Sequence, residues 1–166
     1  MTSLATFAPW PANASSPAQT QLAGLNGVNL TVFVDRDFSG ANALEREIGG
    51  QAKEILANGG LTDDGPDGVW LSIQVTLHPS DEKLRPDDVL VQLKVELSEH
   101  VRLNRDRSVR VPNGAITWSE DYISIASKAD LREYVLKQVD WAVGLFADTV
   151  KSVRSLSDKD AHDRSR

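Results

Sequence analysis

The sequence VLVQLKVELSEHVRL, residues 89–103, decides the fold. Its odd-numbered positions are apolar except Glu99, and its even-numbered positions are polar except Leu90. This period of two is typical of a β-strand that has one buried face and one face in water. We therefore predict one long strand over 89–103, in a sheet that is covered on one side only. We interpret Glu99 as the point where the strand leaves the core, or as an inward charge that protects a sheet edge.

Three further stretches predict strands, over 28–34, 69–78 and 115–125. The first two alternate cleanly. In the third, the alternation breaks, because Ile116, Trp118 and Tyr122 share one parity while Ile123 and Ile125 share the other. A β-bulge near Glu120 and Asp121 would bring these side chains to one face.

Two stretches have the spacing of amphipathic helices. The first is predicted over 43–58, with Asn42 as its cap and Glu45 at the capping-box position. The second is predicted over 128–153, with Ser127 as the cap and Asp130 as its partner. Its apolar stripe consists of Leu131, Val135, Val139, Ala142, Phe146, Val150 and Val153.

The order strand, helix, strand, strand, strand, helix predicts an α+β fold. A strand–helix–strand unit favours a parallel crossover, and successive strands without helices favour antiparallel pairing. We expect a mixed four-stranded sheet with both helices packed on one face. A flexible N-terminal segment over 1–24 precedes the single domain at 25–153, and a flexible tail over 154–166 follows it.

Composition restricts the possible functions. The chain has 166 residues and a net charge of −6, which argues against a nucleic-acid partner. It has no cysteine, which excludes thiol chemistry, disulfides and thiolate metal sites. No run approaches the roughly 18 apolar residues of a transmembrane segment. We expect a cytoplasmic protein if Met1 is the native start, and a protein of the periplasm or cell envelope if a leader has been removed.

Candidate catalytic groups do not converge in the sequence. The three histidines are His78, His100 and His162, and we expect the first two to lie at opposite ends of the sheet. Asp63, Asp64 and Asp67 lie in a Gly- and Pro-containing loop that lacks the spacing of an EF-hand, so we interpret them as turn residues. We therefore predict no catalytic residues, no metal site and no cofactor.

The candidate contact residues point to a protein partner instead. Trp70, Gln92, Lys94 and Glu96 share the predicted water-facing side of the sheet, where an exposed tryptophan can anchor a partner. Trp10 lies in the N-terminal segment. It either packs on the domain or belongs to a docking peptide for a partner.

Four segments resemble a family of small bacterial cell-envelope proteins, periplasmic or lipoprotein-like, of α+β fold. They are LEREIGGQAKEILANGGL, LVQLKVELSEHVRLNRD, AITWSEDY and LREYVLKQVDWAVGLFADTV, and the match covers about residues 25–153. The positions that carry it include Ile116-Thr117-Trp118, Val139-Asp140 and Phe146-Ala147-Asp148. The resemblance implies an envelope location and no catalytic residues, although this chain lacks the export signal that members usually carry.

Three functions therefore remain open. The leading hypothesis is a non-enzymatic binding or structural subunit of a bacterial envelope assembly. The second is a small hydrolase or isomerase that uses Glu99 and His100. The third is a ring-forming assembly protein of a virion or a secretion machine, whose oligomeric state the sequence leaves undetermined.

Overall fold

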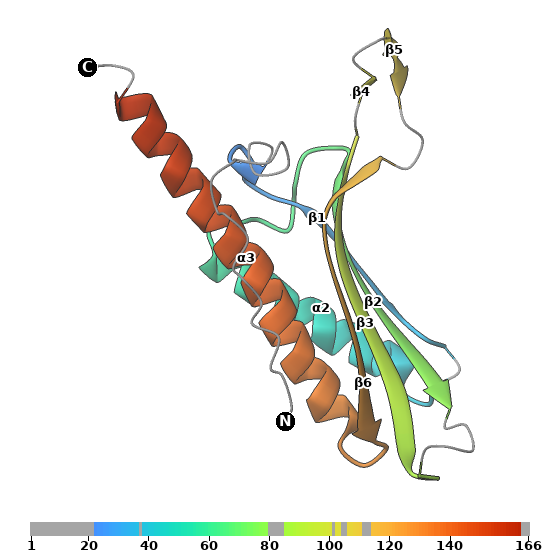
Figure 1. Cartoon of the computed structure of the whole chain (residues 1–166). Helices are drawn as coiled ribbons and strands as arrows, with labels where there is room; N and C mark the ends of the chain where they lie inside the picture. The colour runs from blue at the N-terminus through green and yellow to red at the C-terminus, as the bar shows by residue number, and fades with distance from the viewer. Residues whose placement is uncertain are drawn as a thin grey trace, which may run out of the picture.

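The computed structural model describes residues 22–36, 38–79, 85–100, 102–103, 106–110 and 114–163. Its main body is a four-stranded sheet with a layer of two helices (Figure 1). The elements of this body are β1 (Asn29–Val34), α2 (Ala41–Asn58), β2 (Val69–Pro79), β3 (Asp88–Glu99), β6 (Ala115–Ser127) and α3 (Leu131–Asp163). A separate two-stranded sheet pairs β4 (Arg102–Leu103) with β5 (Asp106–Arg110).

The strand order across the sheet is β1-β2-β3-β6. β1 pairs with β2 in parallel, and the β2–β3 and β3–β6 pairs are antiparallel. Both helices cover the same face of the sheet (Figure 1). The structure thus confirms the predicted α+β fold and its mixed sheet. We call the helix-covered side the inner face and the opposite side the outer face.

The core lies between the inner face and the two helices. The central strands contribute the alternating residues Leu71, Ile73, Val75, Val91, Leu93, Val95 and Leu97. The helices contribute Leu44, Ile48, Ala52, Leu56, Leu131, Val135, Val139, Ala142, Val143, Phe146, Val150 and Val153. The predicted stripe of the second helix is therefore buried along its whole length. The core also includes Leu22, which lies inside the predicted N-terminal segment 1–24.

The last helix extends ten residues beyond Val153, the position at which the sequence analysis ends it. Residues 154–163 contain neither glycine nor proline, so nothing in the local sequence breaks the helix. Arg154 also ties this part of α3 to the loops around it, because its guanidinium donates hydrogen bonds to the carbonyl oxygens of Leu25 and Gly60. At its other end, α3 begins at Leu131, three residues later than predicted. Ser127 and Asp130 are hydrogen-bonded to each other, but Ser127 is the last residue of β6, so the prediction that it caps the helix was wrong.

The first helix begins two residues earlier than predicted, at Ala41. Its N-cap is Gly40, which has a left-handed backbone with φ of 100°, and no side chain caps the helix. The prediction that Asn42 is the cap was therefore wrong. Gly40 can adopt this conformation because it has no Cβ, and Ala41, the first helical residue, is buried.

The long strand ends at Glu99 rather than at Leu103. Glu99 is the last residue with a partner on both sides, since it pairs with Val69 of β2 and with Ala115 of β6. Beyond it, the His100 amide donates a hydrogen bond to the Gly68 carbonyl, and the chain continues into the separate β4–β5 hairpin. The strand thus ends at the level where both of its antiparallel partner strands begin.

The predicted β-bulge is real but lies nearer the start of β6. The register changes between Leu97 and Ser98, which pair with Trp118 and Ile116 and leave Thr117 as the extra residue. The position predicted near Glu120 and Asp121 was therefore wrong. After the bulge, Trp118, Tyr122 and Ala126 face inward.

Candidate functional site

The outer face of the sheet is the side that the helices leave uncovered. Its two central strands present polar side chains there, namely Ser72, Gln74 and Thr76 of β2 and Gln92, Lys94 and Glu96 of β3. All three of the β3 residues that the sequence analysis predicted as partner contacts therefore lie together on this face. They form the centre of the candidate site.

The polar centre is held together by an ion pair and by an amide–carboxylate contact. Lys94 Nζ lies 2.7 Å from Glu96 Oε1, and the Gln92 amide donates to Asp121 of β6 at 3.1 Å. The hydrogen bond with Glu96 raises the pKa of Lys94, which therefore carries a positive charge at neutral pH. The Glu96 side chain is only 11% exposed, and its register partners are Ser72 of β2 and Ser119 of β6.

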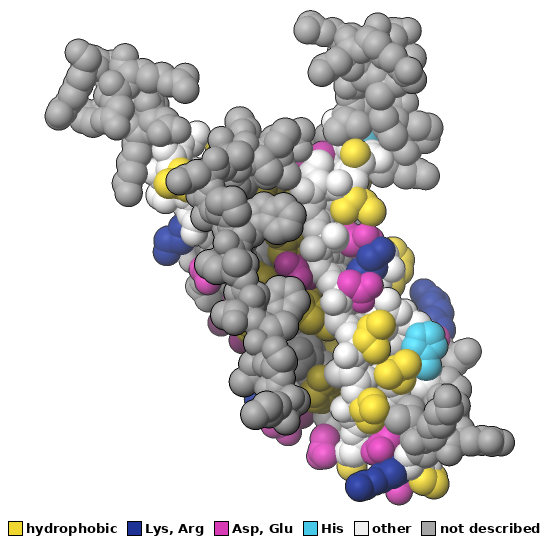
Figure 2. All heavy atoms as spheres, viewed as in Figure 1, with side chains coloured by type: hydrophobic (Ala, Val, Ile, Leu, Met, Phe, Trp, Pro, Cys, Tyr) yellow, Lys and Arg dark blue, Asp and Glu magenta, His cyan; other side chains and the backbone are white. Residues whose placement is uncertain are grey.

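Large hydrophobic side chains lie on the two edge strands of the same face. β6 exposes Ile116 (59%), Ile123 (66%) and Ile125 (53%), and β1 exposes Phe33 (57%). Figure 2 shows hydrophobic side chains above and below a charged group along the side of the molecule that β6 forms. The outer face thus carries exposed apolar side chains on both edge strands, beside a polar centre, and exposed apolar side chains of this size are a common mark of interaction surfaces.

The sequence analysis missed these apolar residues because it misplaced the bulge. A bulge near Glu120 would have turned Ile116, Ile123 and Ile125 toward the core. With the extra residue at Thr117, all three fall on the outer face, in register with Ser98, Gln92 and Leu90 of β3. The break in alternation within 115–125 correctly indicated a β-bulge, but the predicted position of the bulge was wrong.

Trp70 also lies on the outer face, near its margin. Its register neighbours are Asn29 and Ser98, and its ring contacts the ring of His100 edge to face, with centroids 4.9 Å apart. Trp70 is half-buried by these neighbours, so it offers a partner less surface than the isoleucines do. Trp10, the remaining predicted contact, lies outside the described residues.

The groups of the alternative enzyme hypothesis do not meet. The register places Glu99 on the inner side, whereas the ring of His100 packs on Trp70 of the outer face. Neither a hydrogen bond nor an ion pair joins Glu99 to His100 in the described part of the chain. Glu99 Oε2 is buried and has no hydrogen-bond partner there. The arrangement does not supply the acid–base pair that this chemistry needs.

The acidic loop after α2 is occupied by a local ion pair. Lys53 Nζ lies 2.7 Å from Asp63 Oδ2, and its hydrogen bond and charge lower the pKa of Asp63. Among the residues described, no three His, Asp or Glu side chains are grouped in a way that could hold a metal ion.

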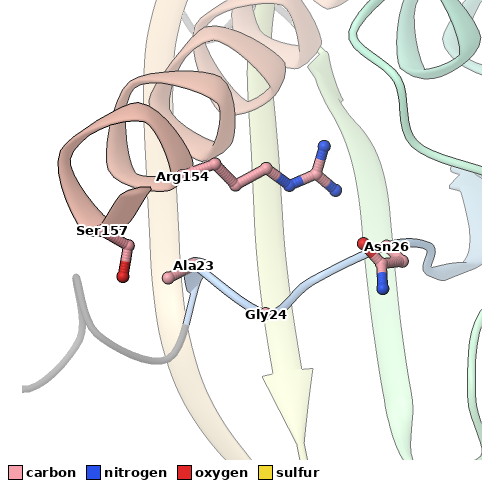
Figure 3. A pocket seen from close by; sticks show the side chains of 5 residues that line it. All are labelled: Ala23, Gly24, Asn26, Arg154 and Ser157. Carbon is pink, nitrogen blue, oxygen red and sulfur yellow. The ribbon is translucent and has the colours of Figure 1, made fainter. Parts of the chain in front are cut away.

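A small polar pocket of about 430 Å³ lies at the far end of α3. It is lined by Ala23, Gly24, Asn26, Arg154 and Ser157. Figure 3 shows the Arg154 side chain extending from α3 along the segment 23–26. Since two nitrogens of its guanidinium already donate to the carbonyl groups of Leu25 and Gly60, the arginine serves mainly to hold these segments together.

The sequence matches no protein-family model and no curated protein. Among solved structures, the chain is similar to the PelC L103M dodecamer from Paraburkholderia phytofirmans, with 16% identity over 76% of this chain and 90% of that chain and a TM-score of 0.43. It is also similar to a minor lipoprotein from Acinetobacter baumannii, with 14% identity over 80% of this chain and 94% of that chain and a TM-score of 0.30. Because both TM-scores are low, we base no functional argument on them.

Within the described residues, none of the helices is both long enough and apolar enough to span a lipid bilayer.

Proposed function

We propose that this chain is a non-enzymatic binding subunit of a bacterial envelope assembly, and that it binds another protein through the outer face of its sheet. The observation that carries the proposal is the set of exposed side chains of Phe33, Ile116, Ile123 and Ile125 around the polar centre. Exposed apolar side chains on an open sheet face favour a protein partner over a small substrate, because small-molecule sites are concave. The envelope location rests on the family resemblance of the sequence.

The charges of the outer face indicate what kind of protein would fit. Lys94, Glu96 and Asp121 form one cluster of a single cation and two carboxylates. The cluster has an excess of one negative charge, which disfavours contact with a second copy of the same cluster. We therefore propose a different protein as the partner. Its contact surface would carry aliphatic side chains and at least one lysine or arginine that lies opposite Asp121.

Affinity capture from the native host tests this proposal. We expect the unmodified chain to recover one stoichiometric partner, and to lose it at high salt because the contact includes charges. Ile123→Ser should reduce the recovery at least tenfold, because it removes an apolar contact without disturbing the core. Ala57→Ser is the control, since it changes an exposed apolar side chain of α2 that lies on neither proposed surface.

Equal recovery by the unmodified chain and by Ile123→Ser would refute the outer face as the binding surface. Light scattering of the purified chain tests the third hypothesis, the ring-forming assembly protein. Such an assembly could use the edge strands β1 and β6, each of which has a neighbour on one side only. A stable ring of identical subunits that Ile123→Ser dissociates would show that the outer face binds copies of this chain rather than a different protein.

A further inference from the structure

Helix α3 carries an apolar stripe that is separate from its buried face. It consists of Trp141 (52% exposed), Leu145 (36%) and Leu156 (59%), and we call it the α3 stripe. At about 100° per residue, these three positions lie within about 60° of one another around the helix. Trp141 and Leu145 are one turn apart and form an exposed apolar patch that favours an occupant, and Leu156 lies about three turns further along, beyond the exposed Ser152.

The stripe lies on the β6 side of α3. The ring of Trp141 contacts the ring of Tyr122 of β6, with centroids 4.7 Å apart and an interplanar angle of 76°. Helix α2 packs against another side of α3, where Gln51 donates to the Leu136 carbonyl oxygen and Glu47 pairs with Arg132 at 2.8 Å. β6 therefore covers part of Trp141, which remains 52% exposed, and α2 packs on another side of the helix.

The described chain begins at one end of this stripe. Leu22 is buried in the core, and the next residue, Ala23, lines the same pocket as Arg154 and Ser157 (Figure 3). Ser157 directly follows Leu156 in the helix. The first described residues of the chain thus lie beside the C-terminal part of α3.

The N-terminal segment 1–21 has the composition and the length to occupy the stripe. It contains no charged side chain, and its large apolar residues Leu4, Phe7 and Trp10 are spaced three apart. In a polyproline-II conformation, which has three residues per turn, these side chains would share one side. The distance along α3 from Leu156 to Trp141 is about 23 Å. The twelve residues from Trp10 to Leu22 span up to about 37 Å in that conformation, which is more than enough.

We propose that the N-terminal segment folds back along α3 of the same chain and packs Trp10 against Trp141 and Leu145. The segment leaves the core at the Leu156 end and runs antiparallel to the helix. Its aromatic side chains cover the part of the stripe that the sheet and α2 leave open. Trp10 then serves as an internal anchor rather than as a contact for another protein. This inference does not depend on the proposed function of the outer face.

Engineered cysteine pairs test the proposal, and the absence of native cysteine makes the test clean. Ala8→Cys is combined with Gln138→Cys, which lies on the stripe side of α3 one turn before Trp141. The control combines Ala8→Cys with Lys151→Cys, at an exposed position on another side of the helix. Both pairs are equilibrated in a glutathione buffer, and the intramolecular disulfide is quantified by non-reducing electrophoresis.

We expect the Gln138 pair to form its disulfide at least tenfold more readily than the Lys151 pair. Lys151 lies closer than Gln138 to the point where the segment leaves the core. A segment that does not pack on the stripe would therefore form the Lys151 disulfide more readily, which is the opposite of the expected result. Adding Trp10→Ala to the Gln138 pair should remove the preference. Equal formation by the two pairs would overturn the proposal. So would a disulfide-linked dimer as the main product, because a second copy would then supply the occupant.

Discussion

Neighbouring residues of the same strand face two different environments in this molecule. Val95 points to the inner face and is completely buried, whereas the adjacent Lys94 points to the outer face and keeps more than a third of its side chain exposed. The inner face of the two central strands is apolar from Leu71 to Val75 and from Val91 to Leu97, and it is covered by α2 and α3. The outer face is mixed in composition, and neither of the two long helices packs on it in the described part of the chain. The inner face therefore sets the fold, while the outer face is free to carry binding.

The largest effect is expected from a charge on the inner side. Val139→Asp should unfold the domain, because Val139 is completely buried and an unpaired carboxylate in the core costs several kcal/mol. Thermal denaturation followed by circular dichroism measures the effect. Ile123→Asp introduces the same carboxylate on the outer face and should leave the melting transition nearly unchanged. If both variants melted alike, the assignment of the two faces would be wrong.

The contrast between the faces was also the part of the fold that the sequence could predict. Alternation identified the buried residues of β2 and β3, and helical spacing identified the buried face of α3 from Leu131 to Val153. Both signals are local, because each depends only on which side chains repeat along one element. The element order then left few topologies, and the predicted mixed sheet was among them.

The features that the sequence could not predict depend on contacts between distant segments. β3 ends at Glu99 because its partner strands begin at that level, although the alternation continues through Val101 and Leu103. Helix α3 continues past Val153, where Arg154 reaches Leu25 and Gly60. The position of the bulge is set by the pairing of β6 with β3, so the exposed isoleucines of the candidate site could not be assigned to a face in advance.

Arg154 tests whether the last part of α3 belongs to the covered layer. Arg154→Ala removes the donors to two carbonyl groups, and we expect it to lower the free energy of unfolding by about 1–3 kcal/mol. Chemical denaturation measures the change. Arg154→Lys should recover only part of it, because an ammonium group cannot reproduce the planar guanidinium. An unchanged free energy of unfolding for Arg154→Ala would show that the end of the helix contributes nothing to the fold.

Tyr122 lies on the inner face, where the covered layer meets solvent. Its ionisation makes the free energy of unfolding depend on pH. Burial and the hydrogen bond to Glu120 raise the pKa of the Tyr122 phenol from 10.0 to about 12. The unfolded chain therefore ionises this group first. Its contribution to stability is complete below pH 10 and is lost as the pH rises toward 12.

The free energy of unfolding, measured as the pH rises from 10 toward 12, should decline. In Tyr122→Phe, the part of this decline that comes from ionisation of Tyr122 should be absent. At neutral pH, Tyr122→Phe should cost about 1 kcal/mol, the usual value of one hydrogen bond. Titration of phenolate absorbance provides an independent measurement. A single transition near pH 10 for both tyrosines would contradict the raised pKa of Tyr122.

The smallest effect on stability is expected on the outer face, and it is the most informative about function. Ile123→Ser should change the free energy of unfolding by no more than about 0.5 kcal/mol, because the side chain is 66% exposed and has little burial to lose. A core isoleucine replaced in the same way would cost several times as much. If Ile123→Ser leaves stability unchanged but abolishes capture of the partner, the isoleucine is retained for binding. A large loss of stability would instead show that Ile123 is part of the core, and the division between the two faces would then fail at β6.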